Sequence, residues 1–205
     1  PKLREQIDVF NFDNRSLVIG INTILIISIK NGNFFFMHKR SKKNLAPAMN
    51  TYHVVPAGTF QPRHMEDGLY YMEFDMYKNI MREFGEELLG QEEFNTMAID
   101  LEDVLDVEPL PYYHSLIESG KGHAYFLGMG LDCLTTKPEF FTALVFKDLD
   151  VKRVKFKDNF EGEHFPVSLT EERMNYYIER EKTLPAGAAC IWLVKKNMDF
   201  FLDQL

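Results

Sequence analysis

The hexapeptide at positions 82–87 reads Arg82-Glu83-Phe84-Gly85-Glu86-Glu87 and places three carboxylates within five residues. In a helix, at about 100° per residue, the three glutamates fall within an arc of about 100°. Like charges at these spacings repel one another. Glu87 also lies inside the edge of the helix's apolar stripe, where a carboxyl is harder to ionise. Bound Mg²⁺ or Mn²⁺ would remove both problems, because carboxylate oxygens are natural ligands of these cations. A solvated, glutamate-rich helix surface is the alternative that these residues leave open.

A helix around this hexapeptide and a hairpin upstream of it are the clearest predicted elements. Apolar residues at helical spacing predict a helix over about 75–89, and Gly90 is typical of a helix C-terminus. Upstream, an Ile- and Val-rich run at 17–30 and a second run at 34–39 predict two strands. Asn31-Gly32 between them suits a tight hairpin turn.

Strands and further helices are predicted on either side of the central helix. A short strand at 52–55 is expected to stop at Pro56-Ala57-Gly58. Later strands are expected at about 104–116, 122–132 and 140–146, and in a short segment after a loop within 158–167. Helices are expected from Thr170, a hydroxyl cap, and from Pro185 or Ala186 to Leu202. This order favours a mixed sheet with helices on its faces.

Length and composition are those of one globular domain, predicted over 17–205 with a polar arm at 1–16. Of the 205 residues, 45% are apolar and 26% are charged, and the formal net charge is −8. This negative charge argues against broad binding to nucleic acid or to membrane surfaces, which requires a basic footprint. The two cysteines, Cys133 and Cys190, lack metal-type spacing and favour a reducing, cytoplasmic environment. The longest apolar run, around 24–27, is too short to span a membrane.

Two segments of the chain together resemble the Nudix box, the signature G-x5-E-x7-R-E-U-x-E-E-x-G-U of the Nudix hydrolase superfamily, in which U is a bulky apolar residue. The segments are Val54-Val55-Pro56-Ala57-Gly58 and Arg82-Glu83-Phe84-Gly85-Glu86-Glu87-Leu88-Leu89-Gly90. The match is specific over R-E-U-x-E-E and covers roughly residues 54–90. It implies a Nudix-type α/β/α sandwich with a mixed central sheet.

The chain departs from the box at three points. Gly58 and Arg82 are 24 positions apart, where the short form of the box has 14, so about ten residues are inserted. Phe74 stands where the box has its first glutamate, and either Glu73 or Asp75 could replace it. The closing glycine, Gly90, comes one position late.

The resemblance implies a divalent-metal-dependent hydrolase that cleaves the diphosphate linkage of a nucleoside diphosphate derivative by attack of water on phosphorus. Glu83, Glu86 and Glu87 would hold Mg²⁺ or Mn²⁺. Arg82 would orient a helix carboxylate such as Glu86, and Gly58 would contribute to the cofactor site as the opening glycine of the box. The alternative is a catalytically weak or inactive Nudix-like domain that binds a nucleotide-type ligand as a sensor or regulatory module.

Members of the family often take a further ligand or base from a loop outside the box. Glu161-Gly162-Glu163-His164 is the leading candidate segment here, with Glu163 as the catalytic residue, and a solvated acidic turn is the alternative. Glu118, in a predicted strand-turn, is a weaker candidate. The phenylalanine-rich composition and the early hairpin are also compatible with a homodimer.

Overall fold

The computed structural model describes residues 18–40, 50–61, 74–91, 103–132, 135–149 and 162–205, together with Asp8, Asn11 and Asp13. The strands are β1 (Gly20–Ile29), β2 (Gly32–Arg40), β3 (Tyr52–Val54), β4 (Ala57–Thr59), β5 (Gly122–Leu131), β6 (Pro138–Phe146) and β7 (Gly162–Ser168). The helices are α2 (Met76–Leu88), the 3₁₀ helix η2 (Val104–Asp106), α3 (Leu110–Glu118), α4 (Glu171–Glu179), α5 (Pro185–Lys196) and α6 (Met198–Asp203). Apart from the three single residues, the predicted arm at 1–16 lies outside the described residues, as does Cys133.

The sheet is mixed, as predicted. Its strand order is β3-β2-β1-β6-β5, with β4 paired to β1 and β7 paired to β2. β1 runs parallel to β6, whereas its pairing with β2 is antiparallel. The predicted hairpin is confirmed, although its turn residues are Lys30 and Asn31, one position earlier than expected. Gly32 begins β2 with a φ of 129°, a backbone conformation that favours glycine.

The segment from β3 to β4 lies beside both strands of this hairpin and brings Gly58 to the start of β1. β3 pairs with the end of β2, and β4 pairs with the first residues of β1. Between them, the carbonyls of Val55 and Pro56 accept hydrogen bonds from the amides of Leu25 (3.2 Å) and Thr23 (2.8 Å). The predicted strand is confirmed as β3 and stops before Pro56, but the sequence did not predict that residues 57–59 form a further strand, β4, which pairs with β1.

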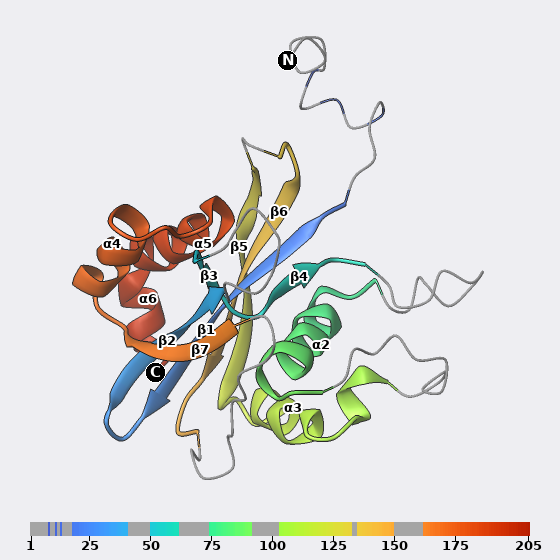
Figure 1. The fold of residues 1–205 in the computed structure, drawn as a ribbon. Coiled ribbons are helices and arrows are strands. Elements are labelled where there is room, and N and C mark those ends of the chain that lie inside the picture. Colours follow the sequence, from blue (N-terminus) through green and yellow to red (C-terminus); the bar gives the residue numbers. More distant parts are fainter. Residues whose placement is uncertain are drawn as a thin grey trace.

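Helices cover both faces of the sheet, with α2 and α3 on one side and α4, α5 and α6 on the other (Figure 1). β1 contributes side chains to the hydrophobic cores on both faces of the sheet, because successive residues point to opposite faces. Ile21, Leu25 and Ile27 pack with α2 and α3, while Ile24 and Ile26 pack with α5. Burial on both faces explains why β1 is an almost continuous apolar run. The predicted α/β/α sandwich is confirmed.

The prediction of a strand at 104–116 was wrong. Residues 104–106 form η2, and α3 begins at Leu110 with a proline in its first turn. Leu110 and Tyr113, one helical turn apart, are both buried against the core beneath α2, where the ring of Tyr113 lies 4.8 Å from that of Phe84. Packing of this helical stripe outweighs the strand propensity of its aromatic residues.

The C-terminal helices follow the prediction in part. Thr170 caps α4 by accepting a hydrogen bond from the amide of Arg173, as expected for its hydroxyl. The predicted single helix from Pro185 to Leu202 is instead divided at Asn197 into α5 and α6. No helix in the described ranges is long and apolar enough to cross a membrane.

Candidate functional site

Helix α2 begins and ends close to where the sequence predicts. Asp75 caps it, because the Asp75 side chain accepts a hydrogen bond from the amide of Lys78 at 3.0 Å. Beyond Leu88, the chain leaves the helix at Gly90, whose φ is 68°. The shift of this glycine by one position therefore lengthens the helix without changing how it ends.

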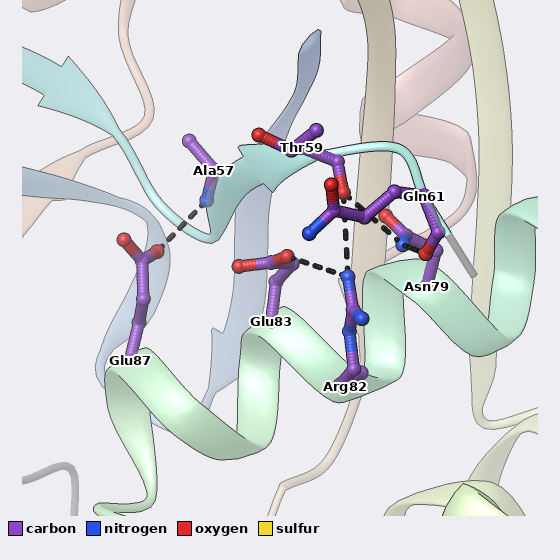
Figure 2. Close-up of polar contacts among 7 residues, drawn as sticks. All are labelled: Ala57, Thr59, Gln61, Asn79, Arg82, Glu83 and Glu87. Carbon is purple, nitrogen blue, oxygen red and sulfur yellow. Dashed lines mark hydrogen bonds and ion pairs between the residues drawn. The ribbon is translucent and has the colours of Figure 1, made fainter. Parts of the chain in front are cut away.

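Two stripes of α2 are turned inward. Ile80, Met81, Phe84 and Leu88 form the apolar stripe and pack in the core between α2, α3 and the sheet. A polar stripe formed by Asn79, Arg82, Glu83 and Glu87 faces the backbone of β4 and the residues just after it (Figure 2). The polar stripe is where the sequence predicted the site.

Glu83 lies directly against Gly58. A Cβ atom at position 58 would overlap the carboxyl group of Glu83, so only glycine permits this approach. Nη2 of Arg82 donates to Oε1 of Glu83 at 3.0 Å and to the carbonyl of Thr59 at 3.3 Å. The side chains of this ion pair are only 10% and 12% exposed. Arg82 thus contacts a helix carboxylate, as expected, and that carboxylate is Glu83, whereas the sequence had suggested Glu86.

Glu87 is held by the same strand. Its Oε2 accepts a hydrogen bond from the amide of Ala57 at 2.8 Å (Figure 2). Glu86 is half-buried and lies on the same side of the helix as Glu83 and Glu87. The structure therefore places the carboxylates of Glu83 and Glu87 beside two consecutive residues of β4.

The donor set is chemically suited to a hard divalent cation. In the part of the chain that the structure describes, no group of three His, Cys, Asp or Glu side chains is placed to hold a metal ion. Mg²⁺ does not require three, because it usually keeps several water ligands and takes one or two carboxylates. The carboxylates of the partly buried residues Glu83, Glu86 and Glu87 are of the type that meets that requirement.

At the position of the missing box glutamate, the chain has a phenylalanine that makes an aromatic contact. Phe74 is 53% exposed, and its ring lies 4.6 Å from that of Phe60. Asp75, one of the two residues proposed to stand in, is used as the helix cap. Glu73, the other, lies outside the described residues.

The predicted residues outside the box occupy other parts of the fold. Glu163 lies on β7 opposite Lys39, on the strand face that carries Phe165 and Val167, which pack with the α4–α5 core. Glu161 is outside the described residues. Glu118 ends α3, so its placement in a strand-turn was wrong, and it lies 3.8 Å from His114.

Two polar features were not predicted from the sequence: the role of Asn79 and the grouping of His164, already part of a candidate segment, with two other histidines. Asn79 is buried on α2, and its only sequence signal is its position one turn before Glu83. His53, His38 and His164 lie opposite one another on β3, β2 and β7. Burial, followed by the charges of Arg40, His38 and Lys137, lowers the pKa of His53 to about 3. These histidines become neighbours only through strand pairing.

Comparison with known proteins gives matches at the level of structure. No family model matches the sequence, and no curated protein sequence matches it. The chain is similar to the Francisella tularensis bifunctional NMN adenylyltransferase/ADP-ribose pyrophosphatase complexed with AMP and a manganese ion, with 12% identity and a TM-score of 0.50 over 96% of this chain and 44% of that chain.

In two further matches, this chain aligns with nearly the whole of the solved chain. A Caenorhabditis elegans Ap4A hydrolase shares 13% identity over 90% of this chain and 98% of that chain, with a TM-score of 0.49. The Nudix domain of Shewanella oneidensis NrtR, complexed with ADP-ribose, shares 8% identity over 92% and 94%, also with a TM-score of 0.49. At such identities, similarity concerns the fold alone. The chain has the Nudix fold.

Proposed function

We propose that this chain, which has the Nudix fold, is a divalent-metal-dependent hydrolase acting on the diphosphate linkage of a nucleoside diphosphate derivative. Water would attack phosphorus and break one P–O bond of the linkage, and the displaced phosphate oxygen would leave with one fragment. The F. tularensis protein is named a bifunctional NMN adenylyltransferase/ADP-ribose pyrophosphatase, and its structure contains AMP and a manganese ion. For this chain, the metal and the substrate class are part of the proposal.

The observation that carries the proposal is the contact between Gly58 and Glu83. These residues are 25 positions apart, with an insertion of about ten residues between them relative to the short box. A Cβ on residue 58 would nevertheless overlap the Glu83 carboxyl group. A carboxylate whose side chain is only 12% exposed and which lies against a glycine backbone is difficult to explain as a solvated surface or as packing, because a side chain on the strand would fill the space without burying a charge.

Arg82 and the three glutamates of α2 each have a role in this proposal. Glu83, Glu86 and Glu87 supply the carboxylate oxygens for the cation, and a bound Mg²⁺ or Mn²⁺ would polarise phosphoryl oxygens and acidify a water molecule. Arg82 holds Glu83, and the amide of Ala57 holds Glu87. The cation also explains how a chain of net charge −8 binds an anionic substrate.

One observation favours the alternative, a Nudix-like domain that binds a nucleotide-type ligand without turnover. Phe74 replaces the first box glutamate and packs against Phe60, and Asp75 is used as a helix cap. The site described here thus has one carboxylate fewer than the box. Under this alternative Glu83, Glu86 and Glu87 still bind the cation, and the ligand stays intact.

A turnover screen tests the proposal. Nucleosides linked through a diphosphate to a second group are incubated with the protein and Mg²⁺ or Mn²⁺, and products are separated by ion-exchange chromatography. We expect metal-dependent release of a nucleoside monophosphate, lost in Glu83→Gln, Glu86→Gln and Glu87→Gln. Glu172→Gln, which alters an exposed glutamate on α4, is the matched control and should keep wild-type activity. Glu163→Gln tests the predicted base outside the box.

The outcomes separate the two functions. If cation and ligand raise the melting temperature but no product forms, the chain is a binding domain without turnover. Binding at a hundredfold excess over the dissociation constant stabilises a protein by about 2.7 kcal/mol, so a ligand would be visible in this measurement. If neither metal nor any nucleotide changes the melting temperature, both functions are wrong.

A further inference from the structure

Asn79 is a buried amide that the box pattern does not specify. It lies on the polar stripe of α2, four residues before Glu83, and is 4% exposed. Its Nδ2 donates to the carbonyl of Thr59 at 3.3 Å and to the carbonyl of Gln61 at 3.4 Å. Both acceptors belong to the backbone directly after Gly58. Asn79 therefore ties the end of β4 to the first turn of α2.

Asn79 shares this task with Arg82. The carbonyl of Thr59 accepts hydrogen bonds from Asn79 and from Nη2 of Arg82, which also holds Glu83 (Figure 2). On the same short segment, the ring of Phe60 packs against Phe74. Residues 59–61 are thus fixed to α2 by backbone carbonyls on either side of Phe60, and the Phe60 ring contacts Phe74 just before the helix.

The orientation of the Asn79 amide is set by its neighbours. Two carbonyl oxygens face it, so only the NH₂ group can satisfy them. Oδ1 of Asn79 is buried and has no hydrogen-bond partner among the described residues. Because an unpartnered buried acceptor is unfavourable, packing alone does not account for an asparagine here. Its two donors do.

We infer that Asn79 is a positioning residue of the cation site, an inference that rests on the proposed function. Thr59 follows Gly58 directly, so a displacement of the Thr59 carbonyl moves the backbone that contacts Glu83 and Glu87. Asn79 fixes β4 at the distance from α2 at which Gly58 meets Glu83 and the Ala57 amide meets Glu87. Asn79 itself contacts neither the cation nor the substrate.

Asn79→Asp is the most direct variant, because it keeps the shape of the side chain and replaces two donors by an acceptor facing two carbonyl oxygens. Mn²⁺ binding is measured by isothermal titration calorimetry, and exchange of the Ala57 amide by NMR. We expect the dissociation constant for Mn²⁺ to rise about 10- to 100-fold, the usual effect of removing a group that orients a metal ligand. We also expect faster exchange at Ala57. Asn79→Ala removes the donors without adding a charge and provides the same test if Asn79→Asp does not fold.

Thr142→Val is the matched control. It removes a buried hydrogen bond of 2.7 Å to Thr23 between β1 and β6, and should leave Mn²⁺ affinity unchanged in the folded protein. Unchanged Mn²⁺ affinity in both Asn79 variants, alongside normal binding by the wild type, overturns the positioning role and leaves the proposed function intact. If the wild type binds no Mn²⁺, the proposed function is wrong and this inference fails with it. An equal loss of affinity in Thr142→Val would also overturn it, because any lost buried hydrogen bond would then have the same effect.

Discussion

Helices α2 and α5 cover opposite faces of one sheet, and they contact it with different chemistry. α5 buries Gly187, Cys190, Ile191 and Val194. Its buried polar group, the Cys190 thiol, donates to the Thr142 carbonyl at 3.3 Å, and burial raises the pKa of this thiol to about 12. α2 instead presents amide, guanidinium and carboxylate groups to the backbone of β4.

This difference separates a structural interface from the interface that carries the proposed cation site. Apolar burial stabilises a helix on a sheet at about 25 cal/mol per Å², and α5 uses it almost throughout. Placing Asn79 and Arg82 at the sheet requires desolvation of both side chains, which hydrogen bonds only offset. The α2–β4 interface therefore gives up stability, and in return it holds Glu83 and Glu87 in fixed positions.

Two glycines, Gly58 on β4 facing α2 and Gly187 within α5, provide the largest test of this comparison. In Gly58→Ala the new methyl group overlaps the flexible Glu83 carboxyl group. Glu83 can turn away, so we expect Mn²⁺ affinity to fall about 10- to 100-fold with a melting temperature close to that of the wild type. In Gly187→Ala the methyl group meets the His53 ring and lies 3.2 Å from the backbone nitrogen of Val54. This variant should lose about 1–3 kcal/mol of stability and retain its Mn²⁺ affinity.

Calorimetric titration and thermal unfolding of both glycine variants measure the two effects side by side. The distinction between the two interfaces is contradicted if Gly187→Ala weakens Mn²⁺ binding as much as Gly58→Ala does. The same distinction is contradicted if Gly58→Ala is as unstable as Gly187→Ala and binds Mn²⁺ normally.

The second prediction concerns pH and the α5 side. His53, against Gly187, has its pKa lowered from 6.5 to about 3 by burial and by nearby positive charge. Below pH 6.5 the unfolded chain binds a proton that the folded chain does not, so stability decreases on acidification. The loss approaches about 1.4 kcal/mol per pH unit between pH 6.5 and about 3. Urea unfolding at several pH values should show a shallower decrease for His53→Gln, and curves that stay parallel to the wild type would contradict this.

The smallest prediction concerns Asp75, the cap of α2. Asp75→Ala should cost about 1 kcal/mol, because the Lys78 amide loses its partner. Asp75→Ser retains a capping oxygen and should keep both stability and Mn²⁺ affinity. Thr170→Ala at the cap of α4 is the matched control for stability. If Asp75→Ser binds Mn²⁺ more weakly, Asp75 acts as the missing box carboxylate as well as a cap.

Local patterns in the sequence were sufficient for the elements that position the site. Three features depend only on neighbouring residues, and the structure confirms them. They are the helical spacing of apolar residues in α2, the end of this helix at Gly90 and the hairpin between β1 and β2. The resemblance to a motif assigned Gly58 and Glu83 to one site but did not predict that the two residues touch. The structure shows that contact despite the insertion.

Features that depend on distant partners were not predictable in the same way. β4 is a strand only because its backbone pairs with β1, and α3 is a helix because Leu110 and Tyr113 find a core beneath Phe84. The pairing of Glu87 with the Ala57 amide joins residues 30 positions apart through a backbone group that no side-chain pattern reveals. The role of Asn79 likewise depends on two carbonyl groups of β4 and the segment after it.

The most direct measurement is anomalous diffraction from crystals soaked with Mn²⁺. The account predicts a manganese peak between α2 and β4, within about 2.0–2.3 Å of carboxylate oxygens contributed by Glu83, Glu86 or Glu87, and no peak there in crystals of Glu83→Gln. A manganese peak coordinated by other residues, with none at these glutamates, would contradict the account.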